Sequence, residues 1–249
     1  MSGGRVLMVA YHFPPSGAVA AQRASKFARY LPEFGWEPVV VARRPDPRQP
    51  ADPSFAGRPA SRVRLNPLEP ARALGVLPRR WIDPLRRFLF VPDEEVGWMV
   101  ALAARLPALV GRFRPDVLWA NSVPTGSLVA AAWTARRLRL PWVADFHNEW
   151  TRNMYYRPAT RVHDVLHHRL ERFVIESAGR IVTLNPLHSE DLRDCFPGVK
   201  VSTIENGFDP RDFEIAPPAP GRRPIVLTYA GAVYGYQSPV PFLQALAEL

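Results

Sequence analysis

Short runs of apolar residues alternate along the chain with longer segments in which apolar residues recur every three or four positions. The short runs predict strands that are buried on both faces, and the longer segments predict helices that connect parallel strands. The expected strands are 5–10, 39–41, 63–65, 117–120, 142–146, 180–184 and 200–204, and the expected helices are 18–34, 94–113, 126–138, 161–177 and 189–195. This order predicts an α/β fold: a Rossmann-like domain with a mainly parallel sheet.

A proline-rich segment interrupts this pattern near the end of the chain. Residues 1–215 hold the elements named above, and the connector 216–224 (APPAPGRRP) follows them, with the composition of a domain boundary. Beyond it, a strand at 225–230 and the start of a helix open a second unit. Chains below about 40 residues rarely bury a core. We therefore expect 225–249 to be the first part of a further domain.

Charge and cysteine content narrow the class of protein. The net charge is +9, and almost all the cations are arginine, which suits an anionic partner such as nucleic acid, a phosphorylated small molecule or a membrane face. Cys195 is the only cysteine, which excludes an internal disulfide and favours a reducing compartment. The apolar stretch 96–110 contains Arg105 and Pro107 and is shorter than a span of about 20 residues. We expect a cytoplasmic protein.

The loop after the first expected strand, residues 11–18 (YHFPPSGA), has features of an anion site. Ligands of open parallel sheets bind beyond the carboxyl ends of the strands. Gly17 lets the backbone approach a ligand, and the next helix directs its N–H groups and positive dipole end there. Arg23 in that helix would face an anionic ligand or solvent. The loop has neither G-x-G-x-x-G nor a P-loop lysine, which argues against those nucleotide sites; a plain turn is the alternative.

A second polar group lies at the end of the strand expected at 142–146. Asp145 and His147 are two residues apart, so the alternation of a strand places both side chains on one side. A carboxylate beside an imidazole can orient the ring and keep it able to exchange protons near neutral pH. We expect Asp145 and His147 to be catalytic. The alternative is a histidine that only forms a hydrogen bond at a strand end.

Other polar residues belong to the same expected edge. Asn121 and Ser122 follow the strand at 117–120 and would bind hydroxyl groups of a ligand or cap the next helix. The turn 205–209 (ENGFD) is interpreted as a plain reversal, because Asn-Gly favours positive φ angles. His163 and His167 are one helical turn apart, but arginines surround them and no third ligand follows at a suitable spacing. We expect no metal site.

The segment 77–90 (LPRRWIDPLRRFLF) interleaves arginines with large apolar residues. Its cations are Arg79, Arg80, Arg86 and Arg87. Arginines are attracted to anionic lipid, each by about 1 kcal/mol, and aromatic side chains enter the interface. This composition favours contact with an anionic membrane surface; the alternative is a loop whose apolar residues cover the core.

Four segments together resemble the subfamily 4-like retaining glycosyltransferases of the GT-B fold. They are YHFPPSGAVAAQR (11–23), ADFHNEW (144–150), IENGFDPRDF (204–213) and LTYAGAVYG (227–235), in that family's order. The resemblance implies two Rossmann-like domains that face each other across a cleft. The first binds the acceptor, and the second binds most of a nucleotide-sugar donor, with no metal or other cofactor. This chain would be the N-terminal half of such a fold.

The resemblance also implies roles for individual residues. Ser16 and Gly17 would lie near the donor diphosphate and transferred sugar, and His147 would contact the reacting sugar. Gly231 would belong to the first glycine loop of the donor domain. We also expect the acceptor to contact Arg23, Asn121, Ser122 and Trp150. The leaving diphosphate would help to deprotonate the acceptor, and the protein would supply positioning and charge stabilisation. The family's glutamate-rich donor motif has no counterpart here, so we expect this span alone to be catalytically incomplete.

The expected function is therefore transfer of a sugar, with retention of configuration, to a glycan or lipid-linked acceptor in polysaccharide or glycolipid synthesis, in the cytoplasm and at the inner membrane face. The alternative is a non-catalytic module that binds an acceptor or a membrane and lacks a donor domain. A nucleic-acid partner is suggested by charge alone, and no nucleic-acid-binding motif supports it.

Overall fold

The computed structural model describes residues 3–47, 51, 61–67, 85–210, 226–229 and 238–248. The chain divides into two units, Met1–Gly207 and Phe208–Leu249. The expected connector 216–224 lies outside the described residues, as do Arg79, Arg80 and Gly231.

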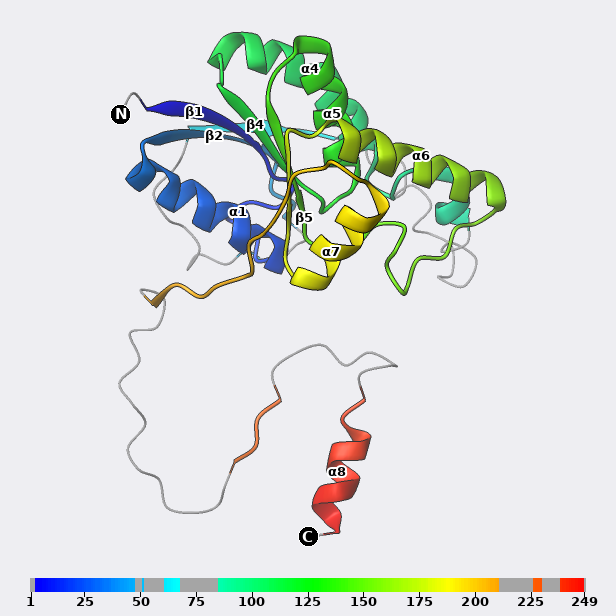
Figure 1. Cartoon of the computed structure of the whole chain (residues 1–249). Helices are drawn as coiled ribbons and strands as arrows, with labels where there is room; N and C mark the ends of the chain where they lie inside the picture. Colours follow the sequence, from blue (N-terminus) through cyan, green and yellow to red (C-terminus); the bar gives the residue numbers. More distant parts are fainter. Residues whose placement is uncertain are drawn as a thin grey trace. The chain divides into compact units, whose positions relative to one another are not determined.

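The first unit is built on a parallel sheet (Figure 1), which has seven strands among the described residues. The strands are β1 (Gly4–Val9), β2 (Trp36–Arg43), β3 (Ser61–Leu65), β4 (Val117–Asn121), β5 (Trp142–Phe146), β6 (Arg180–Thr183) and β7 (Val201–Thr203). Their order is β3-β2-β1-β4-β5-β6-β7, and each neighbouring pair is parallel. The expected Rossmann-like α/β fold is confirmed.

Helices cover both faces of the sheet. The helix α1 (Val19–Tyr30) packs on one face, and α4 (Val96–Phe113), α5 (Gly126–Leu138) and α6 (Arg161–Ser177) lie on the other (Figure 1). Alternate residues of β1 enter the two cores: Leu7 and Val9 face the α4–α5 side, and Val6 and Met8 face α1. Burial on both faces explains why the central strands β1 and β2 contain continuous apolar runs.

The first unit also contains two shorter elements, η1 and α7. The 3-10 helix η1 (Leu31–Phe34) follows α1 and ends at Gly35, whose φ of 78° lies in the left-handed region that glycine adopts readily. The helix α7 (Pro186–Cys195) packs beside β6 and β7. It begins three residues before the expected Ser189, because the Asn185 side chain accepts a hydrogen bond from the His188 N–H and Pro186 occupies the first turn.

The helix α4 is longer than the apolar stretch used to judge it from sequence. Among the described residues it is the one helix long and apolar enough to cross a membrane by length and composition. A helix in the core of a soluble protein can have the same length and hydropathy as a membrane-spanning helix. The side chains of Trp98, Leu102 and Leu106 are fully buried in the core that α4 shares with α5 and the sheet, so one face of α4 packs in the core.

The described part of the second unit departs from expectation in one respect. Residues 226–229 were expected within a strand, but they adopt no regular structure. A strand requires a neighbour for its backbone N–H and C=O groups, and none pairs with these residues in the part of the chain that the structure describes. The helix α8 (Val240–Ala247) has no buried residue. This agrees with a segment too short to bury a core.

One partly buried carboxylate, Asp93, joins the starts of α4 and α5. Its Oδ2 accepts a hydrogen bond from the N–H of Gly126, the first residue of α5, at 2.9 Å. Its Oδ1 accepts one from the N–H of Glu95, the N-cap of α4, at 3.0 Å. Glycine fits at position 126 because an added Cβ would lie 2.9 Å from the Met99 side chain. Burial raises the pKa of Asp93 to about 6, although both backbone hydrogen bonds favour the ionised form.

We expect Asp93 to make stability depend on pH. Its folded pKa of about 6 exceeds the ordinary value of 3.8, so its stabilising contribution is complete below 3.8 and is lost as the pH rises through about 6. Two pKa units correspond to about 3 kcal/mol. Relative to Asp93→Asn, the wild type should therefore lose about 3 kcal/mol of unfolding free energy between about pH 4 and pH 7 in urea titrations.

The matched control is Asp116→Asn, which changes an exposed carboxylate that also accepts a backbone hydrogen bond, from Arg5 at 2.6 Å. A difference between wild type and Asp93→Asn that stays constant over this pH range would contradict the prediction.

Candidate functional site

The candidate site lies at the carboxyl ends of the central strands. The strand order reverses between β1 and β4, and such a switch point is where open α/β sheets bind ligands. Ser16 and Gly17 follow β1, Asn121 ends β4, and Asp145 lies near the end of β5. Asn121 and Asp145 are partners in the β4–β5 register, so their side chains emerge on the same face of the sheet.

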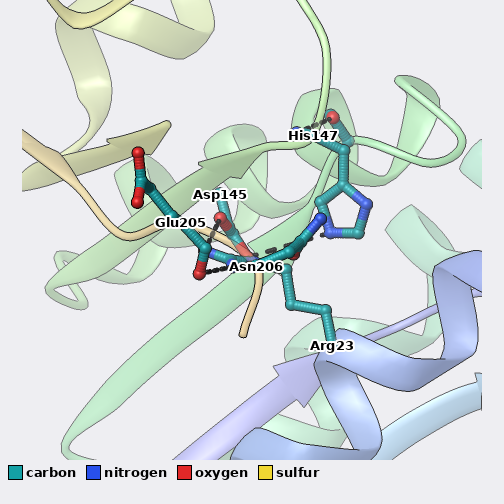
Figure 2. A network of polar contacts seen from close by, with 6 residues as sticks. Arg23, Asp145, His147, Glu205 and Asn206 are labelled. Atoms are coloured by element: carbon teal, nitrogen blue, oxygen red, sulfur yellow. Dashed lines mark hydrogen bonds and ion pairs between the residues drawn. The ribbon is translucent and has the colours of Figure 1, made fainter. Parts of the chain in front are cut away.

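Arg23 and Asp145 form a buried ion pair at this edge (Figure 2). Arg23 extends from α1, and its Nε and Nη2 donate to the two carboxylate oxygens of Asp145 at 2.9 and 3.1 Å. Its Nη1 donates to the Glu205 carbonyl at 3.4 Å and to Asn206 Oδ1 at 3.3 Å. Burial raises the pKa of Asp145, and the hydrogen bonds from Arg23 oppose that shift. Arg23 is therefore buried and does not face solvent. Because Asp145 already balances its charge, Arg23 is not available to bind an anionic ligand, which corrects the expectation from sequence.

His147 lies beside this pair on the same side, as strand alternation predicts. Its Nε2 is 4.0 Å from Asp145 Oδ2, which is too long for a hydrogen bond. Asp145 therefore holds Arg23 rather than orienting the ring by a hydrogen bond, which corrects the expected geometry. Burial lowers the pKa of His147, Asp145 raises it, and Arg23 lowers it further. A lowered pKa keeps the imidazole neutral near pH 7.

Two side chains at this edge carry buried polar atoms that form no hydrogen bond with the described residues. Both Oδ1 and Nδ2 of Asn121 lack a hydrogen bond to any described residue, and so does Nε2 of His147. Asn121 is almost fully buried. Buried polar groups of this kind are nearly always satisfied in proteins. The arrangement therefore suits a ligand that brings hydroxyl groups to Asn121 and His147.

The β1–α1 loop presents the start of α1 to the same edge. The N-cap, Ala18, supplies no side-chain hydrogen bond, and the first turn has no acidic residue to compensate the helix dipole. Ser16 Oγ accepts a weak hydrogen bond from the Ala18 N–H at 3.4 Å, and the Ser16 N–H donates to the Phe13 carbonyl at 3.3 Å. Ser16 and Gly17 thus lie where the sequence placed them, at the N-terminus of α1.

A pocket of about 290 Å³ opens beside this cluster. Aromatic side chains and hydrogen-bonding side chains line it together. It is lined by Pro92, Ser122, Thr125, Phe146, Asn148, Glu149, Trp150, Asn153, Tyr155, Tyr156 and His167. Two expected residues, Ser122 and Trp150, lie in it, whereas Arg23 and Asn121 belong to the buried polar cluster.

Contacts between the β5–α6 loop and α6 shape this pocket. Trp150 Nε1 donates to His167 Nδ1 at 3.0 Å, and the Tyr156 hydroxyl donates to Asp164 Oδ1 at 3.1 Å. Ser122 also lines the pocket and is held in place by two hydrogen bonds: its N–H donates to the Asp145 carbonyl at 2.9 Å, and its Oγ accepts from the His147 N–H at 2.8 Å. Sequence reasoning missed the wall formed by Asn148, Asn153, Tyr155 and Tyr156. The run of polar and aromatic residues after β5 was the available signal.

The histidines of α6 do not converge. His163 Nε2 donates to the Phe88 carbonyl at 2.9 Å, and His167 Nδ1 accepts from Trp150. In the described ranges, no three residues of the types His, Cys, Asp and Glu are grouped so that they would hold a metal ion.

Comparison with known proteins defines the class. Residues 20–212 match the family model "Glycosyltransferase Family 4", and the chain belongs to this family. With the parallel sheet described above, its Rossmann-like domain has the fold of the N-terminal domains of GT-B glycosyltransferases. No curated protein matches the sequence.

Solved structures of similar fold share little sequence with the chain. Sucrose-phosphate synthase from Thermosynechococcus elongatus superposes with a TM-score of 0.52 at 13% identity, over 84% of this chain and 49% of that protein. UGT73P12 of Glycyrrhiza uralensis, solved with glycyrrhetinic acid 3-O-monoglucuronide, gives 0.49 at 10% identity, over 81% and 48%. The chain thus spans about half the length of these proteins.

Proposed function

We propose that the chain is the acceptor-binding half of a glycosyltransferase that moves a sugar from a nucleotide-sugar to a glycan or lipid-linked acceptor, with retention of configuration. One observation carries the proposal: the pocket and the buried polar cluster meet at Ser122. This residue lines the pocket, and its Oγ accepts the hydrogen bond from the His147 N–H. A ligand in the pocket would therefore lie next to the polar atoms of Asn121 and His147 that form no hydrogen bond with described residues.

The pocket suits the acceptor. Its volume of about 290 Å³ is near the lower end for small-molecule sites, which fits one sugar ring rather than a large cofactor. Sugars present C–H faces, which pack on aromatic rings, and hydroxyl groups, which bond to amides and carboxylates. Trp150, Tyr155 and Tyr156 supply the rings, and Asn148 and Glu149 supply the polar groups.

The start of α1 suits the donor. Its uncapped N–H groups and positive dipole end favour the diphosphate, with Ser16 and Gly17 beside it. Asn121 and His147 would then bond to the transferred sugar. Gly231, assigned to the donor side by resemblance, lies outside the described residues and stays a prediction.

The proposed reaction needs no metal or organic cofactor. The bond between the anomeric carbon and the donor phosphate oxygen breaks, a bond from the acceptor oxygen to that carbon forms on the same face, and the acceptor proton passes to the leaving diphosphate. The neutral His147 positions the sugar through a hydrogen bond and does not carry the proton. The work of the protein is positioning and stabilisation of charge.

We expect Glu149→Gln to weaken acceptor use selectively. Glu149 lines the pocket, and a hydrogen bond to a charged group contributes about 1.5–3 kcal/mol, so the acceptor KM should rise about tenfold or more. The donor KM and the melting temperature should stay unchanged. The measurement is sugar transfer by the chain extended with a complete donor-binding domain, at varied concentrations of each substrate.

The matched control is Glu176→Gln. Glu176 lines a different pocket of about 450 Å³, near the C-terminal ends of α5 and α6, and its change should leave both KM values alone. An unchanged acceptor KM in Glu149→Gln would remove the pocket from the acceptor site. Saturable acceptor binding without any transfer by the extended chain would favour the non-catalytic module instead.

A further inference from the structure

The N-terminal half of α6 leaves apolar side chains exposed. Val162, Val165 and Leu166 are 74%, 50% and 40% exposed. Their spacing of three and four residues places them in one stripe along the helix. The buried face of α6 is elsewhere, on Glu171, Val174 and Ile175. The stripe therefore lies outside the core-facing side of α6 and contributes nothing to the core.

A second exposed apolar segment lies beside this stripe. Residues 85–89 form a short helical turn next to the N-terminal end of α6 (Figure 1). The Phe88 carbonyl accepts a hydrogen bond from His163 Nε2 at 2.9 Å, and the two rings are 5.1 Å apart. Both segments therefore contribute to one surface, here called the apolar patch. It consists of Leu85, Phe88, Leu89, Val162, Val165 and Leu166, all of them exposed.

Three arginines lie next to the apolar patch in its two helical segments. Arg87 lies within the short helical turn, Arg161 begins α6, and Arg169 continues the stripe one turn after Val165 and Leu166. All three side chains are exposed. Of the nearby acids, Glu94 pairs with Arg86 at 3.2 Å and Asp164 accepts from the Tyr156 hydroxyl. The surface thus combines exposed apolar groups with a positive rim.

We propose that the apolar patch docks the protein on an anionic lipid bilayer. An amphipathic helix lies in the interface with its apolar side chains in the acyl boundary, and arginines at its rim attract anionic headgroups. Charge complementarity selects this occupant, because the rim is cationic and the whole chain carries a net charge of +9. The apolar patch keeps the described part of the membrane contact expected at 77–90, including Arg87 and Phe88, and adds α6 to it; Arg79 and Arg80 lie outside the described residues.

Docking would bring the pocket close to the bilayer. His167 lines the pocket from α6, one residue after Leu166 of the stripe. A lipid-linked acceptor would then meet the pocket without leaving the membrane; this consequence rests on the proposed function. The docking itself does not, because vesicle binding is measured without sugar transfer.

Vesicle sedimentation tests the apolar contribution. The chain should bind vesicles of phosphatidylcholine mixed with phosphatidylglycerol, and should not bind phosphatidylcholine alone. Val162→Ser with Leu166→Ser should weaken binding about tenfold or more, because two buried side chains are lost from the interface. The matched control, Val100→Ser with Leu138→Ser, changes similarly exposed residues of α4 and α5 and should bind normally. Unchanged melting temperatures show that each variant folds.

Replacement of cations tests the electrostatic contribution. Each arginine near an anionic surface changes binding about fivefold, which corresponds to about 1 kcal/mol. Arg87→Gln, Arg161→Gln and Arg169→Gln together should therefore weaken binding about 100-fold. The same net charge change at Arg105, Arg112 and Arg137, which are exposed on α4 and α5, should matter much less. Wild-type binding should also weaken as salt rises from about 0.1 M to about 1 M.

Three results would overturn the proposal. The first is equal binding to neutral and anionic vesicles. The second is loss of binding in Phe242→Ser with Leu243→Ser, which are exposed on α8, while the patch variants bind normally. The third is a wild-type dimer in sedimentation that Val162→Ser with Leu166→Ser abolishes, because a second copy of the chain would then cover the patch.

Discussion

His147→Ala is expected to reduce sugar transfer about 100- to 1000-fold in the chain extended with a donor-binding domain, as loss of one positioned polar group at a reacting centre does. Its Nε2 is buried and bonds to no described residue, so a substrate hydroxyl is its natural partner. The backbone at residue 147 should keep its conformation, because the hydrogen bond from the His147 N–H to Ser122 Oγ does not involve the ring. The melting temperature should therefore change little.

His168→Ala is the matched control for His147. His168 is exposed on α6 and contacts the Asp164 carbonyl at 2.9 Å, so its loss should leave transfer and melting near normal. The wild-type rate should also not fall as the pH is lowered to 6.5, the ordinary histidine pKa, because burial keeps that of His147 lower. Near-normal transfer by His147→Ala would remove His147 from the site. A collapsed melting transition would make it a structural residue instead.

Breaking the Arg23–Asp145 pair should have the largest effect on stability. Both side chains are buried, at 6% and 0% exposure, so Arg23→Met leaves Asp145 charged, buried and unpaired. Loss of one partner of such a pair costs about 3–5 kcal/mol. In a domain of this size the melting temperature would fall by about 10 °C. Asp145→Asn should also destabilise, because it leaves the Arg23 charge without its counterion.

A double-mutant cycle separates the pair from its surroundings. Arg23→Met with Asp145→Asn should cost less than the sum of the two single changes, because no isolated charge remains. The exposed pair Arg152–Asp191, at 3.1 Å, is the matched control, and its loss should cost at most about 1 kcal/mol. Additive effects at Arg23 and Asp145 would show that the pair is not coupled.

The elements of the first unit could be predicted because their signals are local. The expected bounds of α5, β5 and α6 agree with the structure residue by residue, since apolar periodicity and turn residues mark both ends. Thr160 illustrates the point: its side chain accepts the His163 N–H and fixes the start of α6. The strand expected at 225–230 did not form in its described residues, because a strand also needs a neighbour that the local pattern does not supply.

The site could be predicted only in part because its contacts are not local. Strand alternation placed Asp145 and His147 on one side, and the edge of the sheet brought Asn121 near them. Asp145 forms its ion pair with Arg23, which is 122 positions away in the sequence, and no sequence pattern predicts that pair. The turn at Glu205 and Asn206 was interpreted as a plain reversal for the same reason. Its contact with Arg23 exists only once β7 has joined the sheet.

The contacts of Arg23 with Glu205 and Asn206 have a consequence for folding during synthesis. The hydrogen bonds from Arg23 to Glu205 and Asn206 span 182 and 183 positions. Contacts of such separation carry the largest loop-closure entropy and depend on topology already in place. On the ribosome, α1 and β1 emerge early, but Arg23 meets these partners only after residue 206 has left the exit tunnel. These contacts of Arg23 therefore form late in synthesis, and a nascent chain that stops before β7 would hold the Arg23–Asp145 pair without them.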